Sequence, residues 1–220
     1  MYDREPRWLL ALTALLGALA MTLAGRLEGV TLAGGHLTSP RAVAVVAATL
    51  EELAGLAVVV GVAFWARRAF NDPMDGLVYG SMTGLGMALE ESVAYLRGGP
   101  PRSVLPPAEL VRVCGHLVMT GIGGFPIGLL AVGRHGALVA LVTCVGAAVG
   151  LHFGWDWIAL DAEAANASNL VHAAAGGLLM LSGLLLYGAL TAAAARWSHD
   201  LFAPKSPFRL WGWPFDRSKA

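Results

Sequence analysis

Residues 41–66 read RAVAVVAATLEELAGLAVVVGVAFWA, an apolar run interrupted near its middle by the adjacent pair Glu51 and Glu52. A helix that spans a bilayer needs about 20 mostly apolar residues, and this run is long enough. A charge at the bilayer centre costs at least about 2.5–3.5 kcal/mol on insertion scales, so such residues normally face a cavity or a partner. The run therefore predicts a transmembrane helix that carries functional carboxylates.

The whole chain has the composition of a membrane protein. Hydrophobic residues make up 56% of the 220 positions, charged residues make up 14%, and the mean hydropathy is +0.63. Soluble domains carry about 25% charged residues. The formal net charge is zero, which leaves no basic field that would attract nucleic acid. We therefore expect the lipid bilayer as the main surroundings and no nucleic-acid partner.

Apolar segments of similar length recur along the sequence, separated by clusters of Gly, Pro, Asn and Asp. They predict an all-α fold, a polytopic bundle of about six transmembrane helices in a single integral membrane domain over residues 1–220. We place the helices at 8–25, 41–66, 75–97, 109–133, 136–159 and 169–195.

Lys and Arg are distributed unevenly between the two sides of the predicted bundle. Ten lie on the side of the first residue and four on the opposite side. Because basic residues stay in the cytoplasm, we expect both termini there. The tail 196–220, rich in Trp, Phe, Pro and basic residues, fits a segment at the inner headgroup surface as well as an unstructured end. Segment 8–25 ends in small residues like a signal peptide, but Asp3 and Glu5 in its flank and its length favour a retained helix.

Acidic and imidazole side chains lie inside four successive predicted helices. At a rise of about 1.5 Å per residue, most of them fall roughly 9–15 Å from the outer helix ends, with Asp156 nearer the surface. They therefore share one layer in the outer half of the membrane, and we expect a four-helix core over residues 41–160 to hold a site there. The candidate site residues are Glu51, Glu52, Glu91, His116, His152 and Asp156.

Spacing also predicts which of these side chains share a helix face. His152 and Asp156 are four residues apart, which would let the carboxylate orient the ring. Arg112 lies on the face of His116, either as an interfacial residue or as a group that neutralises a carboxylate. Neighbouring residues lie about 100° apart around a helix, so Glu51 and Glu52 point in different directions.

The segment DGLVYGSMTGLGMALEESVAY at 75–95 resembles the PrsW intramembrane proteases, whose pattern is close to DGxxYGxxxGxGFAxxENxxY. Glu51-Glu52 resembles the EExxK motif of that family, the segment from His116 to Gly123 its histidine and Thr-Gly block, and His152 with Asp156 its HxxxN/D motif. Three positions depart from the pattern: Gly55 replaces Lys, Met87 replaces Phe, and Ser92 replaces Asn.

The resemblance implies a superfamily shared with the type II CAAX prenyl proteases and the APH subunit of gamma-secretase. It implies a protease in a bacterial cytoplasmic membrane that cleaves a membrane protein substrate, such as a single-span anti-sigma factor. Glu51 or Glu52 would activate water in either of two mechanisms. In one, Glu91, His116 and His152 bind Zn²⁺; in the other, no metal is present and the histidines polarise the carbonyl.

Two other classes of function use the same residues. Buried Glu, Asp and His build ion pathways in proton- or cation-coupled transporters, but the polar layer is off-centre and no internal repeat is visible. A non-catalytic scaffold or binding protein of the same superfamily would use them as a buried hydrogen-bond network. The missing lysine at Gly55 keeps the scaffold in consideration.

Overall fold

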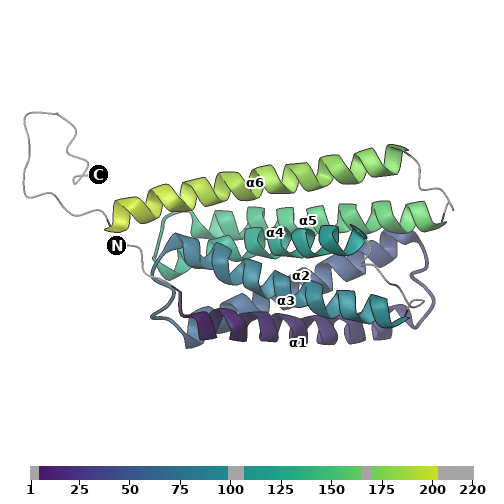
Figure 1. The fold of residues 1–220 in the computed structure, drawn as a ribbon, viewed down its shortest axis with the longest axis horizontal. Coiled ribbons are helices and arrows are strands. Elements are labelled where there is room, and N and C mark those ends of the chain that lie inside the picture. Colours follow the sequence, from purple (N-terminus) through teal and green to yellow (C-terminus); the bar gives the residue numbers. More distant parts are fainter. Residues whose placement is uncertain (1–4, 99–106, 165–169, 203–220) are drawn as a thin grey trace, which may run out of the picture.

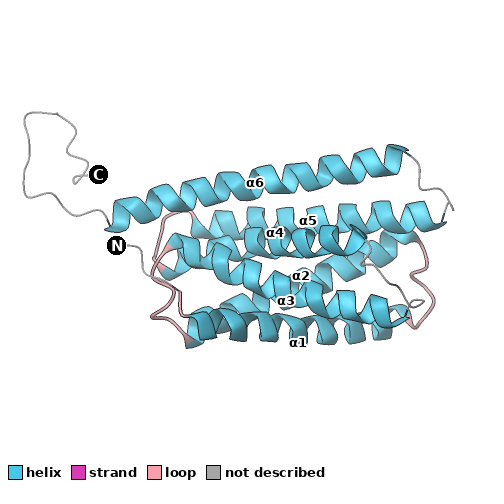
Figure 2. Ribbon diagram, in the orientation of Figure 1, coloured by secondary structure: helices cyan, strands magenta, loops and turns pink. Residues whose placement is uncertain are grey.

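The computed structural model describes residues 5–98, 107–164 and 170–202. These residues form an antiparallel bundle of six helices, without a strand among them (Figures 1 and 2). The helices are α1 (Arg7–Leu32), α2 (Pro40–Trp65), α3 (Pro73–Gly98), α4 (Pro107–Ala131), α5 (Ala137–Ala164) and α6 (Leu170–Phe202). The predicted fold class and helix order are confirmed.

We call the end of the bundle where α1, α3 and α5 begin the proximal end, and the opposite end the distal end. Proline opens α2, α3 and α4, where its missing N–H is not needed and its fixed φ suits the first helical turn. The Ser39 hydroxyl accepts a hydrogen bond from the Ala42 amide at 3.2 Å and so caps α2. The turn between α4 and α5 places Gly133 and Gly136 at φ values of 66° and 81°, which favour glycine.

Three helices are longer than predicted. The α1 helix continues to Leu32 instead of ending at residue 25, and α5 continues to Ala164 instead of 159. The α6 helix continues to Phe202 instead of 195, so the predicted tail begins inside this helix and its remainder, 203–220, lies outside the described residues. Polar residues such as Arg26 and Glu28 do not end a helix, because its backbone hydrogen bonds remain satisfied. The chain turns only at Gly34 and Gly35, where Gly35 has a φ of 66°.

Helix α3 occupies the centre of the bundle between α1 and α4. Its glycines allow backbones to touch: a Cβ added to Gly80 would lie 2.6 Å from the Thr120 carbonyl oxygen, and one added to Gly84 would overlap the carbonyl of His116. All the other helices are long and apolar enough to cross a membrane by length and composition. The more polar composition of α3 is tolerated because its neighbours cover it.

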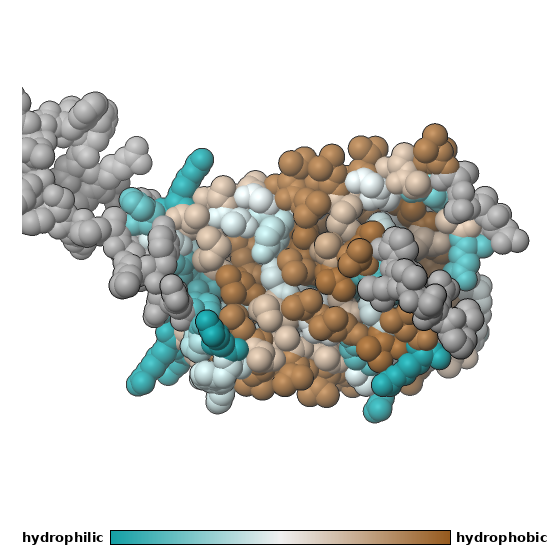
Figure 3. All heavy atoms as spheres, in the orientation of Figure 1, coloured by the Kyte–Doolittle hydropathy of each residue, from teal (hydrophilic) through white to brown (hydrophobic). Residues whose placement is uncertain are grey.

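The outer surface of the bundle suits a bilayer. Hydrophobic side chains occupy the middle of the visible face, and hydrophilic ones gather toward its two ends (Figure 3). Helix α6 lies at the edge of the bundle against α5 (Figure 1). Large apolar side chains that would be costly in water are exposed around the girth, among them Leu15, Leu19, Phe64, Val142 and Leu185.

Candidate active site

Three helices bring two imidazoles and a carboxylate together inside the distal half of the bundle. The Glu51 Oε2 atom of α2 lies 3.5 Å from Nε2 of His152 on α5 and 3.8 Å from Nε2 of His116 on α4. The two rings pack edge to face with centroids 5.0 Å apart. Each of the three residues offers a ligand atom within 4.8 Å of the others, and all three are buried.

Glu51 and Glu52 serve different sides of the same imidazole. The Glu52 Oε1 atom lies 2.9 Å from His152 Nδ1, while Glu51 approaches Nε2 of that ring. With its proton on Nδ1, the ring donates to Glu52, and Nε2 then presents its lone pair toward Glu51. The pair therefore diverges as the helical spacing predicts. The Asp156 Oδ2 atom also lies on the Nε2 side, at 3.5 Å.

Glu91 of α3 connects the site to an arginine. Its Oε2 lies 2.8 Å from His116 Nε2, and its Oε1 lies 3.2 Å from Nε of Arg112. Arg112 also pairs with Glu109 and stacks over the ring of Tyr95, 4.2 Å from the centroid. Of the two roles open to Arg112 from sequence, the structure shows the one that neutralises carboxylates.

Glycine packing positions His116 and Glu91. Because Gly84 has no side chain, α3 approaches α4 at the His116 backbone itself. The close approach places Glu91, seven residues further along α3, beside the His116 ring at 2.8 Å. A bulkier residue at position 84 would separate the two helices and these two side chains.

Glu28 of α1 is a member of the site that sequence reasoning missed. Its side chain lines the same cavity as Glu51, and its Oε1 atom is buried without a hydrogen-bond partner. Nearby on α1, Thr22 donates a hydrogen bond to Glu90 of α3 at 3.1 Å. Glu28 lay beyond the predicted end of the first helix, at residue 25. If that helix had been extended, Glu28 would have fallen two turns after the buried Met21, on the same helix face. The polar site therefore draws on α1 as well as on the four predicted core helices.

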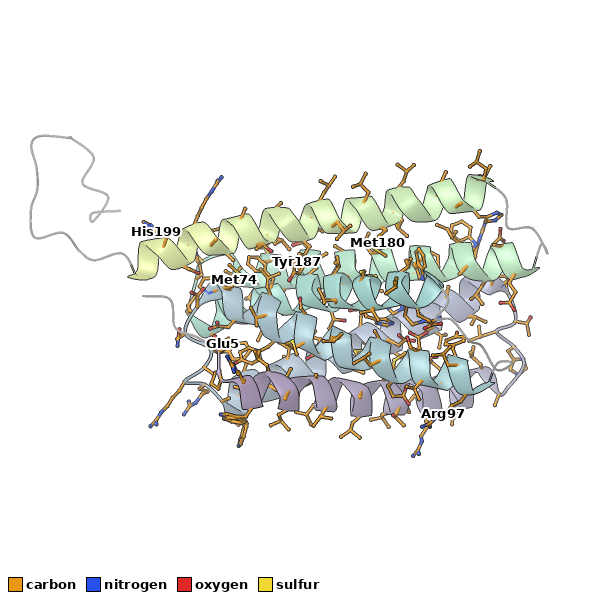
Figure 4. All side chains as sticks on the ribbon, viewed as in Figure 1. Glu5, Met74, Arg97, Met180, Tyr187 and His199 are labelled. Carbon is orange, nitrogen blue, oxygen red and sulfur yellow. The ribbon has the colours of Figure 1, made fainter. Side chains whose placement is uncertain are left out.

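These side chains line a cavity of about 590 Å³. It reaches from Glu51, His116 and His152 toward the distal ends of α1 and α5, where Arg26 and Glu163 line it. Figure 4 shows side chains filling the bundle, with Arg97 at this distal end and Glu5 at the other. His172 of α6 does not line this cavity, and its Nε2 lies 3.3 Å from Oδ2 of Asp161 at the surface.

The donor set fits a divalent metal. Two imidazole nitrogens and one carboxylate oxygen are the three protein ligands typical of a catalytic zinc site, which keeps a further position for water. At His116 a metal would take the place beside Nε2 that the Glu91 carboxylate holds in this structure. The Glu51 Oε2 atom is buried without a hydrogen-bond partner, a costly condition that a bound cation would relieve. The compact trio contains Glu51, whereas the trio predicted from sequence contains Glu91 in its place.

Two departures from the PrsW pattern contact each other. A Cβ added to Gly55 would lie 3.0 Å from Sδ of Met87 and 2.8 Å from Cγ2 of Thr120. Met87 is fully buried, so the space beside Gly55 is already filled. The structure thus leaves no room for the lysine of EExxK without a rearrangement of Met87 and Thr120.

Comparison with known proteins gives one match. The model of the PrsW family of intramembrane metalloproteases matches residues 5–187, which include α1 to α5 and the first half of α6. No curated protein and no solved structure matches the chain. The matched region contains every residue of the cavity described above, and the chain belongs to the PrsW family of intramembrane metalloproteases.

Proposed function

We propose that this protein hydrolyses a peptide bond of a membrane-embedded substrate at the cavity formed by α1 to α5, with Glu51, His116 and His152 as metal ligands. The observation that carries the proposal is the unpaired, buried Glu51 Oε2 atom facing the Nε2 atoms of both histidines. A scaffold would be expected to satisfy this atom internally, as buried networks usually do.

When bound, Zn²⁺ would supply a water of lowered pKa and polarise the scissile carbonyl. Glu52 holds the His152 ring through Nδ1 and so keeps Nε2 directed at Glu51. Such a carboxylate orients a ligand and does not touch the substrate. Because its side chain is only 2% exposed, Glu52 is poorly placed to accept a proton from water.

Glu91 is better placed to take that proton. Its side chain is 18% exposed to the cavity, and Arg112 beside it stabilises the ionised form of the carboxylate. We assign Glu91 as the general base and Asp156, 24% exposed on the Nε2 side of His152, as the general acid. Asp156 starts protonated and gives its proton to the leaving amine, and the proton taken up by Glu91 restores it before the next turnover. Glu91 thus replaces Glu51 and Glu52 as the base, since Glu51 is assigned as a metal ligand and the Glu52 side chain is enclosed.

The substrate enters, on this proposal, from the lipid. An apolar groove of about 860 Å³ lies along α5 and α6 and shares Val111, Trp155 and Ala159 with the catalytic cavity. Such a groove accepts a hydrophobic helix, which suits a single-span substrate such as an anti-sigma factor. With both termini in the cytoplasm of a bacterium, the site would cut near the extracytoplasmic end of that helix.

Reconstitution into proteoliposomes tests the proposal with two independent measurements. One is zinc content of the purified protein by mass spectrometry; the other is cleavage of a fluorescence-quenched single-span helical reporter. We expect Glu51→Gln, His116→Ala and His152→Ala each to lose zinc and cleavage. The matched control is Glu163→Gln, at the mouth of the same cavity, which should keep both.

Three outcomes separate the alternatives. Wild-type cleavage that persists without zinc and resists a chelator would establish the metal-free mechanism. Variants that retain zinc and cleavage would overturn the site. Zinc binding without cleavage, even of short water-soluble peptides, would favour the scaffold.

A further inference from the structure

The proximal end of α1 and α2 encloses a second cavity, of about 510 Å³, far along the bundle from the active site. Trp8 and Trp65 line it, with their rings edge to face and 6.1 Å between centroids. Both side chains are exposed, by 60% and 67%. Exposed tryptophans at helix ends are typical of the headgroup level of a bilayer, where one part of the ring is apolar and the N–H is wet.

Two cations on the rim of this cavity have no carboxylate partner. Arg67 and Arg68 follow the end of α2, are exposed, and form no ion pair with any residue that the structure describes. Asn71, the last lining residue along the chain, donates from its side-chain amide to the Arg68 carbonyl oxygen at 3.2 Å and so fixes the chain at this rim. A guanidinium pair with free N–H groups is suited to the oxygens of a phosphate, which it can bind through two parallel hydrogen bonds.

The one acidic lining residue, Glu5, is already engaged. Its carboxylate accepts a hydrogen bond from the hydroxyl of Tyr79, and the Tyr79 ring is fully buried and stacked on Phe70 with centroids 4.9 Å apart. Figure 4 shows Glu5 at the proximal end of the bundle, beside the start of α1. Tyr79 thus holds the negative charge toward the bundle and leaves the arginines available at the rim.

We propose that this cavity binds the headgroup of an anionic phospholipid. The phosphate lies against Arg67 and Arg68, and the acyl chains run down the outer surface past Trp8, Trp65 and the 82% exposed Phe64. Positive charge alone would recruit free phosphate equally well. The adjoining aromatic and apolar wall is what favours a lipid over a soluble anion.

Native mass spectrometry of the delipidated full-length protein tests this proposal. The protein is titrated with dioleoyl phosphatidylglycerol, with dioleoyl phosphatidylcholine and, separately, with inorganic phosphate. We expect one tightly retained phosphatidylglycerol, weaker phosphatidylcholine binding, and no saturable phosphate binding. The double variant R67Q/R68Q should weaken phosphatidylglycerol binding about 30-fold. The variant R67K/R68K keeps the charge but lacks the parallel N–H donors of the guanidinium, and it should weaken binding less.

The matched control is R7Q/R196Q. Both arginines are exposed at the same end of the bundle and outside the cavity, so the variant removes the same charge from the same membrane face. It should leave the tight site intact. If R67Q/R68Q and R7Q/R196Q weaken phosphatidylglycerol binding equally, the effect is one of general charge and the proposal fails. If phosphatidylglycerol and phosphatidylcholine are retained equally, headgroup recognition is refuted. If inorganic phosphate binds saturably, the ligand is a free anion and not a lipid.

Discussion

The two ends of the bundle bury carboxylates in opposite ways. At the proximal end, Asp75 Oδ2 accepts hydrogen bonds from the amides of Asn71 and Asp72, both at 2.8 Å. Asp72 in turn accepts from the Met74 amide at 2.7 Å and from the hydroxyl of Ser198 on α6. Each of these acids accepts two hydrogen bonds from the protein itself. They stabilise the start of α3 and connect α6 to it.

In the distal half, the acids face imidazoles and a cavity, and two of their oxygens lack partners. The unpartnered atoms are Oε1 of Glu28 and Oε2 of Glu51. Carboxylates with free acceptor capacity beside histidines are equipped to bind a cation or handle protons. The PrsW-like segment 75–95 therefore has two parts: its Asp75 accepts hydrogen bonds at the start of α3, whereas its Glu91 lines the cavity beside His116, where we propose that it acts as the general base.

Replacement of Glu91 gives the sharpest test of this division. We expect Glu91→Gln to lower cleavage by about 10²–10⁴-fold, because the general base is removed. Zinc content and thermal stability should stay near wild type, since Glu51 and not Glu91 completes the compact trio. Measured loss of zinc in this variant would instead restore the trio of Glu91, His116 and His152.

Arg112 tests whether the distal acids depend on a supporting cation. Without the guanidinium 3.2 Å from Glu91, the carboxylate loses its orientation and a stabilising charge. We expect Arg112→Gln to lower kcat about 10–100-fold, as loss of a supporting partner typically does. Arg112→Lys should recover part of it.

The pH profile distinguishes support of Glu91 from a general loss of fold. The limb of the kcat profile that reports ionisation of the base should move to higher pH in Arg112→Gln, because a nearby positive charge favours the carboxylate. A fall in kcat with an unchanged profile would make Arg112 a packing residue only.

Asp75 should affect stability and leave the chemistry intact. Asp75→Ala removes the acceptor of two backbone amides, and we expect a loss of about 1–3 kcal/mol in the free energy of unfolding. Denaturation in mixed micelles measures this loss, and zinc content per folded molecule should not change. If the free energy of unfolding changes little but the zinc content falls, the two ends of the bundle are coupled.

Much of the site was predictable because it follows from helix geometry. The depth of Glu91, His116 and His152 in one layer came from counting residues along straight helices, and those residues do lie together. The divergence of Glu51 and Glu52 followed from the 100° step between neighbours. Glu28 was missed because hydropathy ends a segment at the first charged residues, although a helix can continue past them.

Other features depend on distances between helices, which no spacing within one helix reveals. Sequence indicated that Asp156 would orient His152, whereas the closest carboxylate to that ring is Glu52 from α2, at 2.9 Å. Likewise Gly55 and Met87 depart from the family pattern at positions 32 residues apart in the chain, and only the packing of α2 against α3 shows that they share one space.

The sequence by itself determined the membrane class, the six helices and the set of acids and histidines at one depth. Hydrophobic run length and the 1.5 Å rise are local properties, so they can be read one segment at a time. Only the tertiary structure decided which carboxylate faces which nitrogen. For Glu91 and His116 that choice follows from the close approach of α3 to α4 at Gly84, and for Glu51, Glu52 and His152 it follows from how α2 packs against α4 and α5. Helix separation and rotation are long-range properties, and a ligand set depends on both.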